Sequence, residues 1–330
     1  MGMSRRTVRV GALAAIAVGL FMVRAVPRRR FDATPIVLSA DAGHVKVGTE
    51  KQTCHRLRFP RNEPTAVDRI EIRVHGGSHH VHLYRPYNGP LEWPTRNCPF
   101  AIDFDKWQLV AATQNAALDW HLHPGVGILF EPHQPLMIQT HFVNTGLLSV
   151  KGRAAAKMRL HPAAPETIHA YGGAFFGQDR TVLVPPGTTT LATRCPITGV
   201  GADARDLTIM AFTGHYHFRG VRFQIFRVRT DGSLDMDHPL YDHAGYQDPP
   251  FEQYPATDPL VLKAGEGIEW WCTYDNDPAR WDDQTFKFGP NTAMNEHCNL
   301  FGFYYPAAAS QEAIDCVHKA DGVTRIVAQN

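Results

Sequence analysis

Apolar and polar residues alternate over several short stretches of the chain. The clearest are Arg69–Val74 (RIEIRV), Leu136–Val143 (LMIQTHFV) and Val221–Val228 (VRFQIFRV). Leu207–Phe212 and Leu300–Tyr305 are mostly apolar and rich in β-branched or aromatic residues. A period of two is typical of strands with one buried face, and short apolar runs are typical of strands buried on both faces. We therefore predict strands over these five segments.

Turn signals separate the predicted strands, among them PYNGP, HPGVG, VPPGT, TDGS and KAGEG. No long stretch shows the 3.6-residue period of a helix. Many short strands joined by turns are typical of β-sandwiches or barrels, so we predict an all-β fold. The segment His161–Thr167 (HPAAPET) is a predicted linker between two sandwiches of similar length. The predicted domains are therefore residues 31–163 and residues 168–320.

The first thirty residues differ from the rest of the chain. A basic start, MGMSRRTVRV, precedes an uncharged segment, Val10–Val23. This segment fits the roughly 7–15 apolar residues of a signal peptide and is shorter than the roughly 17–25 of a membrane span. Cleavage after Ala25 is one interpretation, and an uncleaved membrane anchor is the other. Residues 1–30 thus predict an exported protein, periplasmic or extracellular, that contacts a membrane only through this segment and only if the segment is uncleaved.

Composition and cysteine content agree with an exported, folded protein. Hydrophobic residues make up 44% of the chain, charged residues 20%, and the net charge of +1 gives no indication of a nucleic-acid partner. The six cysteines include no CxxC pair, and an even number in an exported chain suggests three disulfides. The alternative is six free thiols in a cytosolic protein.

Histidine is the unusual residue, with 18 in the chain. An H-x-H pair on a strand turns both imidazoles to one face, within reach of one metal ion. His215 and His217 form such a pair directly after an apolar strand, and in SHHVHLY the same rule selects His80 and His82. His141 lies on a predicted strand, but its local pattern alone does not identify it as a ligand.

A fourth segment, Thr292–Tyr305 (TAMNEHCNLFGFYY), carries Met294, His297 and Cys298 just before a predicted strand. Methionine and histidine are both suitable copper ligands, whereas Cys298 fits a disulfide better.

Taken in order, these blocks resemble the copper type II, ascorbate-dependent monooxygenases, the family of dopamine β-hydroxylase and peptidylglycine α-hydroxylating monooxygenase. The resemblance covers roughly residues 45–318. The matching pieces are TCHRLRFP, SHHVHLY, LMIQTHFVN, RCPIT, FTGHYHFRG, WWCTYDN and NEHCNLFGFYY.

The resemblance implies two tandem jelly-roll-like β-sandwich domains, each with one copper, facing each other across a solvent-filled cleft. The adjacent pair His79 and His80 then replaces the pair chosen by periodicity. Two neighbouring side chains face one ion only where the backbone bends, as at a bulge, and GGS before them favours such a bend. His82 becomes a neighbour that packs or hydrogen-bonds. The implied ligands of the electron-transfer copper are His79, His80 and His141.

For the oxygen-binding, catalytic copper the implied ligands are His215, His217 and His297. The implied disulfides are Cys54–Cys98, Cys195–Cys316 and Cys272–Cys298. The implied reaction hydroxylates a C–H bond of a small organic substrate with O2, with ascorbate or a similar donor as reductant.

This sequence departs from the family pattern at three positions. His297 stands where characterised members have a methionine, with Met294 three residues earlier. The peptide-hydroxylating members hold a substrate carboxylate with an arginine and a tyrosine, and these positions are Thr213 and Phe301 here. Without that clamp, a glycine-extended peptide is not expected as substrate. The alternative functions are an exported copper-binding protein of the same fold without hydroxylase activity, and a purely structural β-sandwich protein.

Overall fold

The computed structural model describes residues 31–75, 77–87, 93, 98, 106–144, 154–281, 283–308, 312–318 and 325–329. The predicted signal or anchor segment, residues 10–23, lies outside these residues. Among the residues described, no helix is long and apolar enough to cross a membrane. Residues 33–330 form one compact unit, so the division into domains 31–163 and 168–320 stays a prediction.

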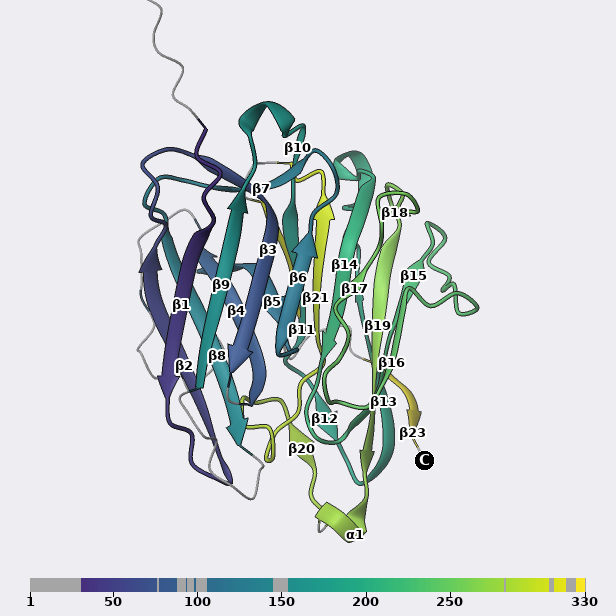
Figure 1. Ribbon diagram of the computed structural model, residues 1–330. Helices are drawn as coiled ribbons and strands as arrows, with labels where there is room; N and C mark the ends of the chain where they lie inside the picture. Colours follow the sequence, from purple (N-terminus) through teal and green to yellow (C-terminus); the bar gives the residue numbers. More distant parts are fainter. Residues whose placement is uncertain are drawn as a thin grey trace, which may run out of the picture. The chain divides into compact units, whose positions relative to one another are not determined.

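The unit is built almost entirely from strands, which confirms the all-β prediction (Figure 1). The five strands predicted above all form. The helical pieces described are short: η1 (Pro165–Thr167), η2 (Gly201–Asp203) and α1 (Pro278–Trp281). The first of these lies in the predicted linker segment.

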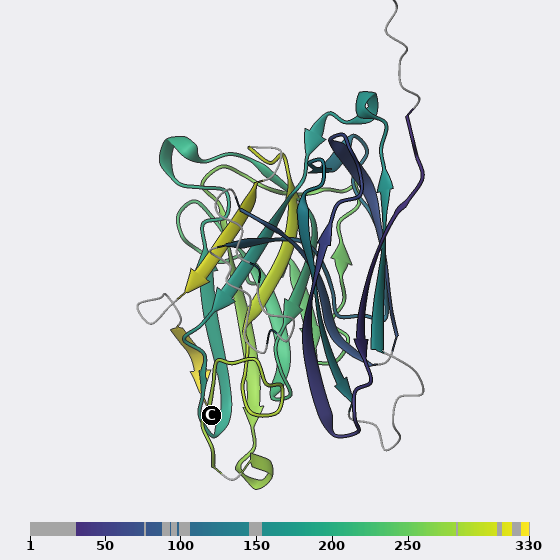
Figure 2. The same ribbon diagram turned by 90° about the vertical axis from the view of Figure 1, so that its left-hand side faces the viewer.

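Two sheets come mainly from the first half of the chain, with one short strand, β10 (Ala170–Tyr171), from the second. The first runs in the order β1 (Ile36–Gly43), β9 (Ala154–Pro162), β3 (Thr65–His75), β7 (Val126–Phe130) and β10, with β6 (Ala117–His121) also paired to β3. The second runs β2 (Thr49–Arg58), β8 (Pro135–Asn144), β4 (Ser78–Pro86) and β5 (Trp107–Thr113). Figure 2 shows these sheets, purple to teal, from the side.

Two further sheets come from the second half. One runs β17 (Glu252–Gln253), β14 (Leu207–His215), β21 (Asn299–Tyr305), β11 (Gly173–Asp179) and β22 (Ala313–His318), with β18 (Leu260–Leu262) paired to β14. The other runs β16 (Tyr241–Ala244), β15 (Gly220–Val228), β19 (Gly267–Asn276), β13 (Gly187–Cys195) and β23 (Arg325–Gln329). A separate ribbon pairs β12 (Leu183–Val184) with β20 (Phe286–Lys287).

Each pair of sheets encloses an apolar core, and the first core extends into the second half of the chain. Phe176, Phe301 and Phe303 belong to the cluster that contains Trp120 and Phe142. The rings of Trp120 and Phe303 lie 4.6 Å apart. The two halves are therefore joined by packed aromatic side chains, and their contact surface positions the residues described next.

Three disulfides tie the described strands and loops together, one in the first half and two in the second. They are Cys54–Cys98, Cys195–Cys316 and Cys272–Cys298, the same pairs that the resemblance implies. Such bonds persist in oxidising compartments, which agrees with the predicted export.

Candidate metal centre

A bulge in strand β4 brings His79 and His80 to the same place. The register between β4 and β8 shifts between Ser78 and His80, so His79 is the extra residue of the bulge. The bend predicted at this point is therefore confirmed. The ring of His79 lies 5.3 Å from that of His80 and 5.2 Å from that of His141. His80 and His141 are cross-strand partners, with rings 5.1 Å apart.

His82 keeps the strand period and lies on the same face as His80. The two rings are stacked, 4.3 Å apart and 10° from parallel. Nδ1 of His82 lies 2.9 Å from the hydroxyl of Tyr84, and its cross-strand partner is Gln139. His82 thus packs and hydrogen-bonds beside the first histidine set, as the sequence predicted for it.

His215 and His217 lie at the end of β14 and in the turn after it. Nδ1 of His215 lies 2.6 Å from Oε1 of Gln114, and Nδ1 of His217 lies 3.0 Å from the carbonyl of Asn295. Both oxygens accept, so each Nδ1 carries the proton and donates it. The amide of Gln114 is fixed in this orientation because its Nε2 donates to the carbonyl of Gly214. Each ring therefore presents an unprotonated Nε2 to the cluster.

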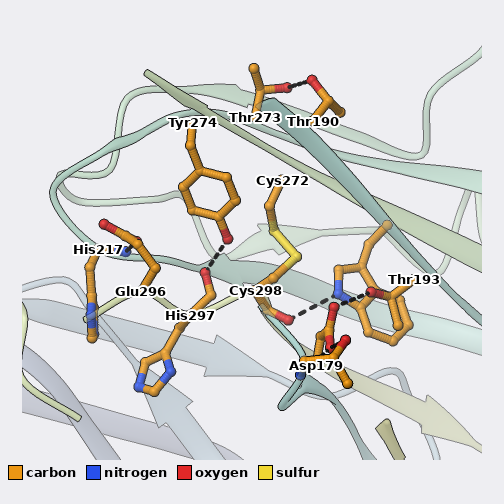
Figure 3. Close-up of a disulfide and its surroundings, with 12 residues drawn as sticks. Asp179, Thr190, Thr193, His217, Cys272, Thr273, Tyr274, Glu296, His297 and Cys298 are labelled. Carbon is orange, nitrogen blue, oxygen red and sulfur yellow. Dashed lines mark hydrogen bonds between the residues drawn. A yellow bond between two sulfur atoms is a disulfide. The ribbon is translucent and has the colours of Figure 1, made fainter. Parts of the chain in front are cut away.

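His297 joins this pair from the segment before β21. Its ring lies 4.3 Å from His217 and 5.4 Å from His215. Its backbone carbonyl accepts a hydrogen bond from Tyr274, and the neighbouring Cys298 is bonded to Cys272 on β19 (Figure 3). These two ties hold His297 at the cluster. Met294, by contrast, is 59% exposed, so its position favours His297 as the third residue of this set.

The two histidine sets are in contact with each other. The ring of His79 lies 4.7 Å from His215 and 5.4 Å from His217. Two triples have nitrogens close enough to share an ion: His79, His80 and His141, and His79, His215 and His217. The structure therefore differs from the implied cleft between separate sites, because the aromatic contact between the halves brings the facing strands β4 and β14 together.

The imidazole nitrogens fit a metal that binds neutral histidine. Several buried nitrogens have no hydrogen-bond partner: His79 Nε2, both nitrogens of His80, His82 Nε2, His217 Nε2 and His297 Nδ1. Buried polar atoms are normally paired, so this many free nitrogens in one place indicates a missing common partner. Burial lowers the pKa of His82 and His217 to about 3. Burial likewise lowers the pKa of His79, His80, His215 and His297 well below 6.5. All six are neutral at pH 7, as ligation of copper requires.

Glu50 connects the first histidine set to the segment that carries His297. Nε2 of His141 donates to its carboxylate over 3.0 Å, which leaves Nδ1 as the free nitrogen of that ring. Asn291 and Thr292 also donate to Glu50. Burial raises the pKa of Glu50, but the bonds from His141 and Thr292 outweigh burial and lower it below its ordinary value. The carboxylate is therefore ionised and orients its three partners.

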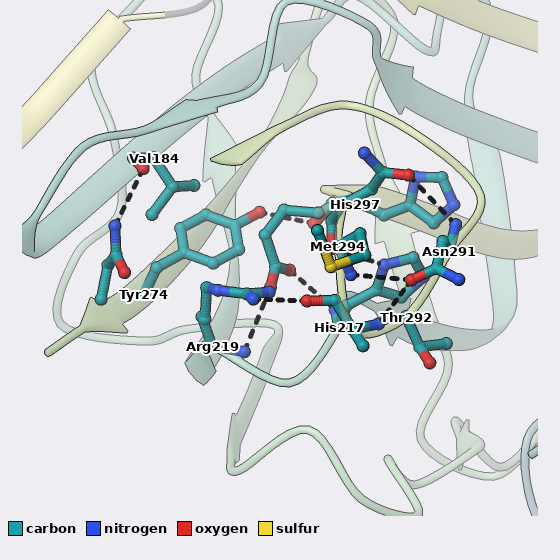
Figure 4. A network of polar contacts seen from close by, with 12 residues as sticks. Val184, His217, Arg219, Tyr274, Asn291, Thr292, Met294 and His297 are labelled. Atoms are coloured by element: carbon teal, nitrogen blue, oxygen red, sulfur yellow. Dashed lines mark hydrogen bonds and ion pairs between the residues drawn. The ribbon is translucent and has the colours of Figure 1, made fainter. Parts of the chain in front are cut away.

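A buried ion pair supports the second set. Arg219 Nη1 lies 3.0 Å from Oε1 of Glu296, and both side chains are fully buried. Glu296 also accepts hydrogen bonds from the backbone N–H groups of His217 and Arg219. Figure 4 shows how this network links Arg219 to the segment that ends at His297. The pair thus fixes the turn of His217 against the neighbour of His297.

Local patterns in the sequence identify neither Glu50 nor Gln114, because Glu50 on β2 and Gln114 directly after β5 are both distant in sequence from the histidines they contact. Glu296 lies in the NEHCN motif, which identifies its segment but not its role. Arg219 follows the H-x-H pair, and nothing in its local pattern indicates burial.

One comparison with known proteins agrees with the family indicated by the motifs. Residues 175–323 match the family model described as copper type II ascorbate-dependent monooxygenase, C-terminal domain. The resemblance is thereby confirmed over these residues, which include the second histidine set. None of the curated proteins compared with the chain matches it.

Among solved structures, PNGase F, a glycosylasparaginase from Flavobacterium meningosepticum, is 9% identical. It aligns over 89% of this chain and 100% of its own, with a TM-score of 0.36. PBCV-1 VP54 is 9% identical over 91% of this chain and 98% of its own, with a TM-score of 0.23. Likenesses at these scores carry no conclusion about the fold or the site.

Proposed function

We propose, from the match of residues 175–323 to the C-terminal domain of the copper type II, ascorbate-dependent monooxygenases, that the chain is a copper-dependent monooxygenase. It hydroxylates a C–H bond of a small organic molecule. The observation that carries this proposal is the cluster of buried, neutral imidazoles contributed by both halves of the chain. The balanced reaction takes substrate, O2, two electrons and two protons to hydroxylated product and water.

In this proposal His79, His80 and His141 hold the electron-transfer copper, and His215, His217 and His297 hold the oxygen-binding one. When bound, copper supplies electron transfer and dioxygen activation. The protein holds the ligands in fixed tautomers: Gln114 accepts from His215, the carbonyl of Asn295 accepts from His217, and Glu50 accepts from His141. Such partners typically account for 10–100-fold in metal affinity.

Where the peptide-hydroxylating members bind a carboxylate with an arginine and a tyrosine, this chain has Thr213 and Phe301 beside the second set. Thr213 and Phe301 are cross-strand partners on β14 and β21. The ring of Phe301 packs against Phe176 at 5.2 Å and lies 6.2 Å from His215. Neither side chain carries a positive charge to pair with a carboxylate, so the preferred substrate presents an uncharged C–H group here.

A copper measurement and a labelled-oxygen assay test the proposal. The expected result is about two coppers per chain and an ascorbate-dependent product with one atom from labelled O2, over a panel of phenethylamines, fatty amides and peptides. His121→Ala is the matched control for histidine removal, since that side chain is 66% exposed. His297→Ala should lose copper, whereas the control should keep it. A protein without copper contradicts the proposal.

The second candidate is an exported copper-binding protein without hydroxylase activity. The observation that favours it is His297 in place of the expected methionine, because an all-imidazole site is a harder donor set that favours Cu(II). Copper-loaded protein that gives no labelled product across the panel supports this alternative. A His297→Met variant that gains activity would support it further, whereas a variant that loses activity supports the monooxygenase.

A further inference from the structure

The turn from Asn291 to Asn295 joins the two histidine sets through hydrogen bonds. At its first residue, the side-chain amide of Asn291 donates to Oε1 of Glu50, whose Oε2 accepts from His141 over 3.0 Å. At its last residue, the carbonyl of Asn295 accepts from Nδ1 of His217 over 3.0 Å. Figure 4 shows Asn291 and His217 together. A connected set of hydrogen bonds therefore runs from one proposed ligand set to the other.

Bonds within the turn tie its two ends to each other. Oδ1 of Asn291 accepts from the backbone N–H groups of Ala293 and Met294, over 3.1 and 2.8 Å. The backbone N–H of Asn295 donates to the carbonyl of Asn291 over 2.9 Å, and the N–H of Asn291 donates to Oδ1 of Asn295 over 3.2 Å. The side chain of Asn295 is also packed against Gly289, where an added Cβ would overlap it. The turn therefore moves as one piece, and a displacement of its Asn291 end reaches Asn295.

Glu50 holds this turn from the other half of the chain. It lies on β2, and its Oε2 accepts from the hydroxyl of Thr292 over 3.0 Å and from the N–H of Thr292 over 3.3 Å. Thr292 is 2% exposed, so solvent hardly competes for these bonds. Hydrogen bonds to an ionised acceptor are about twice as strong as neutral ones. One carboxylate thus fixes both His141 in the first half and the turn in the second.

Two effects of opposite sign follow for a pair of bound ions. An ion on the free Nδ1 of His141 fixes that ring and polarises its N–H, and hydrogen bonds joined in a chain strengthen one another. Because the ring, Glu50 and the turn are then already ordered, less ordering remains for the second ion. Against this, the rings of His79 and His215 lie 4.7 Å apart, and two cations bound to rings in contact repel each other. The repulsion does not pass through Glu50, so a substitution at that residue separates the two effects.

We propose that the turn Asn291–Asn295, held by Glu50, contributes a favourable coupling between the two histidine sets: through it, an ion in either set raises the metal affinity of the other. The inference rests on the proposed function, which places one copper in each set. The coupling is reciprocal, because binding at both sets forms one thermodynamic cycle, and couplings of this kind typically amount to about 5–150-fold. Glu50 and Asn291 are positioning residues here, since they act on the ions through His141 and His217.

Nitrogen NMR of the metal-free protein, with isotope-labelled histidine, tests the link without copper. We expect Asn291→Ala to shift the ring-nitrogen signals of both His141 and His217, although its side chain bonds to Glu50 and to the turn rather than to either ring. Met294→Ala is the matched control, because this side chain is 59% exposed at the tip of the same turn, and its loss should leave both signals in place. An Asn291→Ala variant in which either ring keeps its native signals overturns the proposal.

Copper binding, followed by chelator competition with Cu(II), measures the coupling itself. The coupling factor is the two-ion binding constant of the protein divided by the product of the two single-set constants. His297→Ala gives the constant of the first set, and His80→Ala gives that of the second. The same three measurements in a Glu50→Gln background complete a double-mutant cycle, in which the repulsion between the ions cancels. We expect Glu50→Gln to lower the coupling factor at least about fivefold.

Glu71→Gln is the matched control for this substitution. The side chain of Glu71 is 17% exposed, against 22% for Glu50, and lies 3.6 Å from a histidine outside the cluster, His161, so its loss should leave the coupling factor unchanged. A factor that Glu50→Gln leaves unchanged, or raises, overturns the proposal. Labelled product from a protein with such a factor refutes this inference alone, whereas a factor that depends on Glu50 without labelled product refutes the proposed monooxygenase alone. If the chain binds no copper, the proposed function fails and the NMR comparison decides the link.

Discussion

Replacing Arg219 by methionine removes one partner of the buried ion pair behind the second histidine set. The guanidinium donates to Glu296 and to the carbonyl of Ala293, and it lies 3.2 Å from the ring centroid of Phe286. Methionine fills most of the volume without charge or donors, so little of the effect comes from a cavity. The variant therefore isolates the loss of the charge partner.

At pH 8.5 the expected loss of stability is about 3–5 kcal/mol, because Glu296 must either stay charged and buried without its counter-ion or take up a proton from a solution in which protons are scarce. Both side chains of the pair are fully buried, so solvent does not screen the effect. The free energy of unfolding of a typical protein is about 5–15 kcal/mol. The variant should therefore remain folded, with a much smaller free energy of unfolding.

The loss should grow with pH. Burial raises the pKa of Glu296 to about 7 in spite of Arg219, and removal of the guanidinium raises it further. A carboxyl group whose folded pKa lies above its unfolded value loses stability as pH rises, until the folded pKa is passed. In the native protein this loss ends near pH 7, whereas in the variant it continues above pH 7 at about 1.4 kcal/mol per pH unit.

Urea unfolding of the metal-free protein at pH 6.0 and pH 8.5, with disulfides intact, measures the effect. Arg222→Met is the matched control, because the pair of Arg222 with Asp242 is 52% and 32% exposed. Exposed pairs contribute about 0–1 kcal/mol, so the control should unfold close to the native protein. An Arg219→Met variant as stable as that control refutes the reasoning, and an equal loss at both pH values refutes its electrostatic part.

Three further predictions concern the histidines. Gln114→Leu removes the acceptor of His215 Nδ1 and should weaken copper binding about 10–100-fold in chelator competition, while unchanged affinity would show that Gln114 does not fix the ring. Glu50→Gln should change the copper electron-paramagnetic-resonance signal of the site that contains His141, and an identical signal would exclude Glu50 as its orienting partner. The metal-free protein should lose stability as pH falls from about 6.5 towards 3. In this range the six histidines take up protons in the unfolded chain but stay neutral in the folded one. Each of them then lowers the free energy of unfolding by about 1.4 kcal/mol per pH unit. Equal urea midpoints at pH 7.5 and pH 5.5 would contradict this linkage.

The sequence alone was sufficient for five of the strands and for the order of the motifs. Alternation and apolar runs identified β3, β8, β14, β15 and β21, because side-chain direction in a strand follows from its period of two. The disulfide pairs came from the resemblance, and the structure contains the same three.

The tertiary structure decided which imidazoles meet. Periodicity chose His80 and His82, but a single bulge turned His79 towards His80 and His141, and a period cannot reveal an inserted residue. The contact of His79 with His215 depends on how the two halves pack.

Packing also decides which residues hydrogen-bond to the histidines and to the segment before β21. Glu50 and Asn291 are 241 residues apart in sequence, and only the folded chain brings them together. A local pattern records which face a side chain takes; the identity of its neighbour on that face is a property of the whole fold.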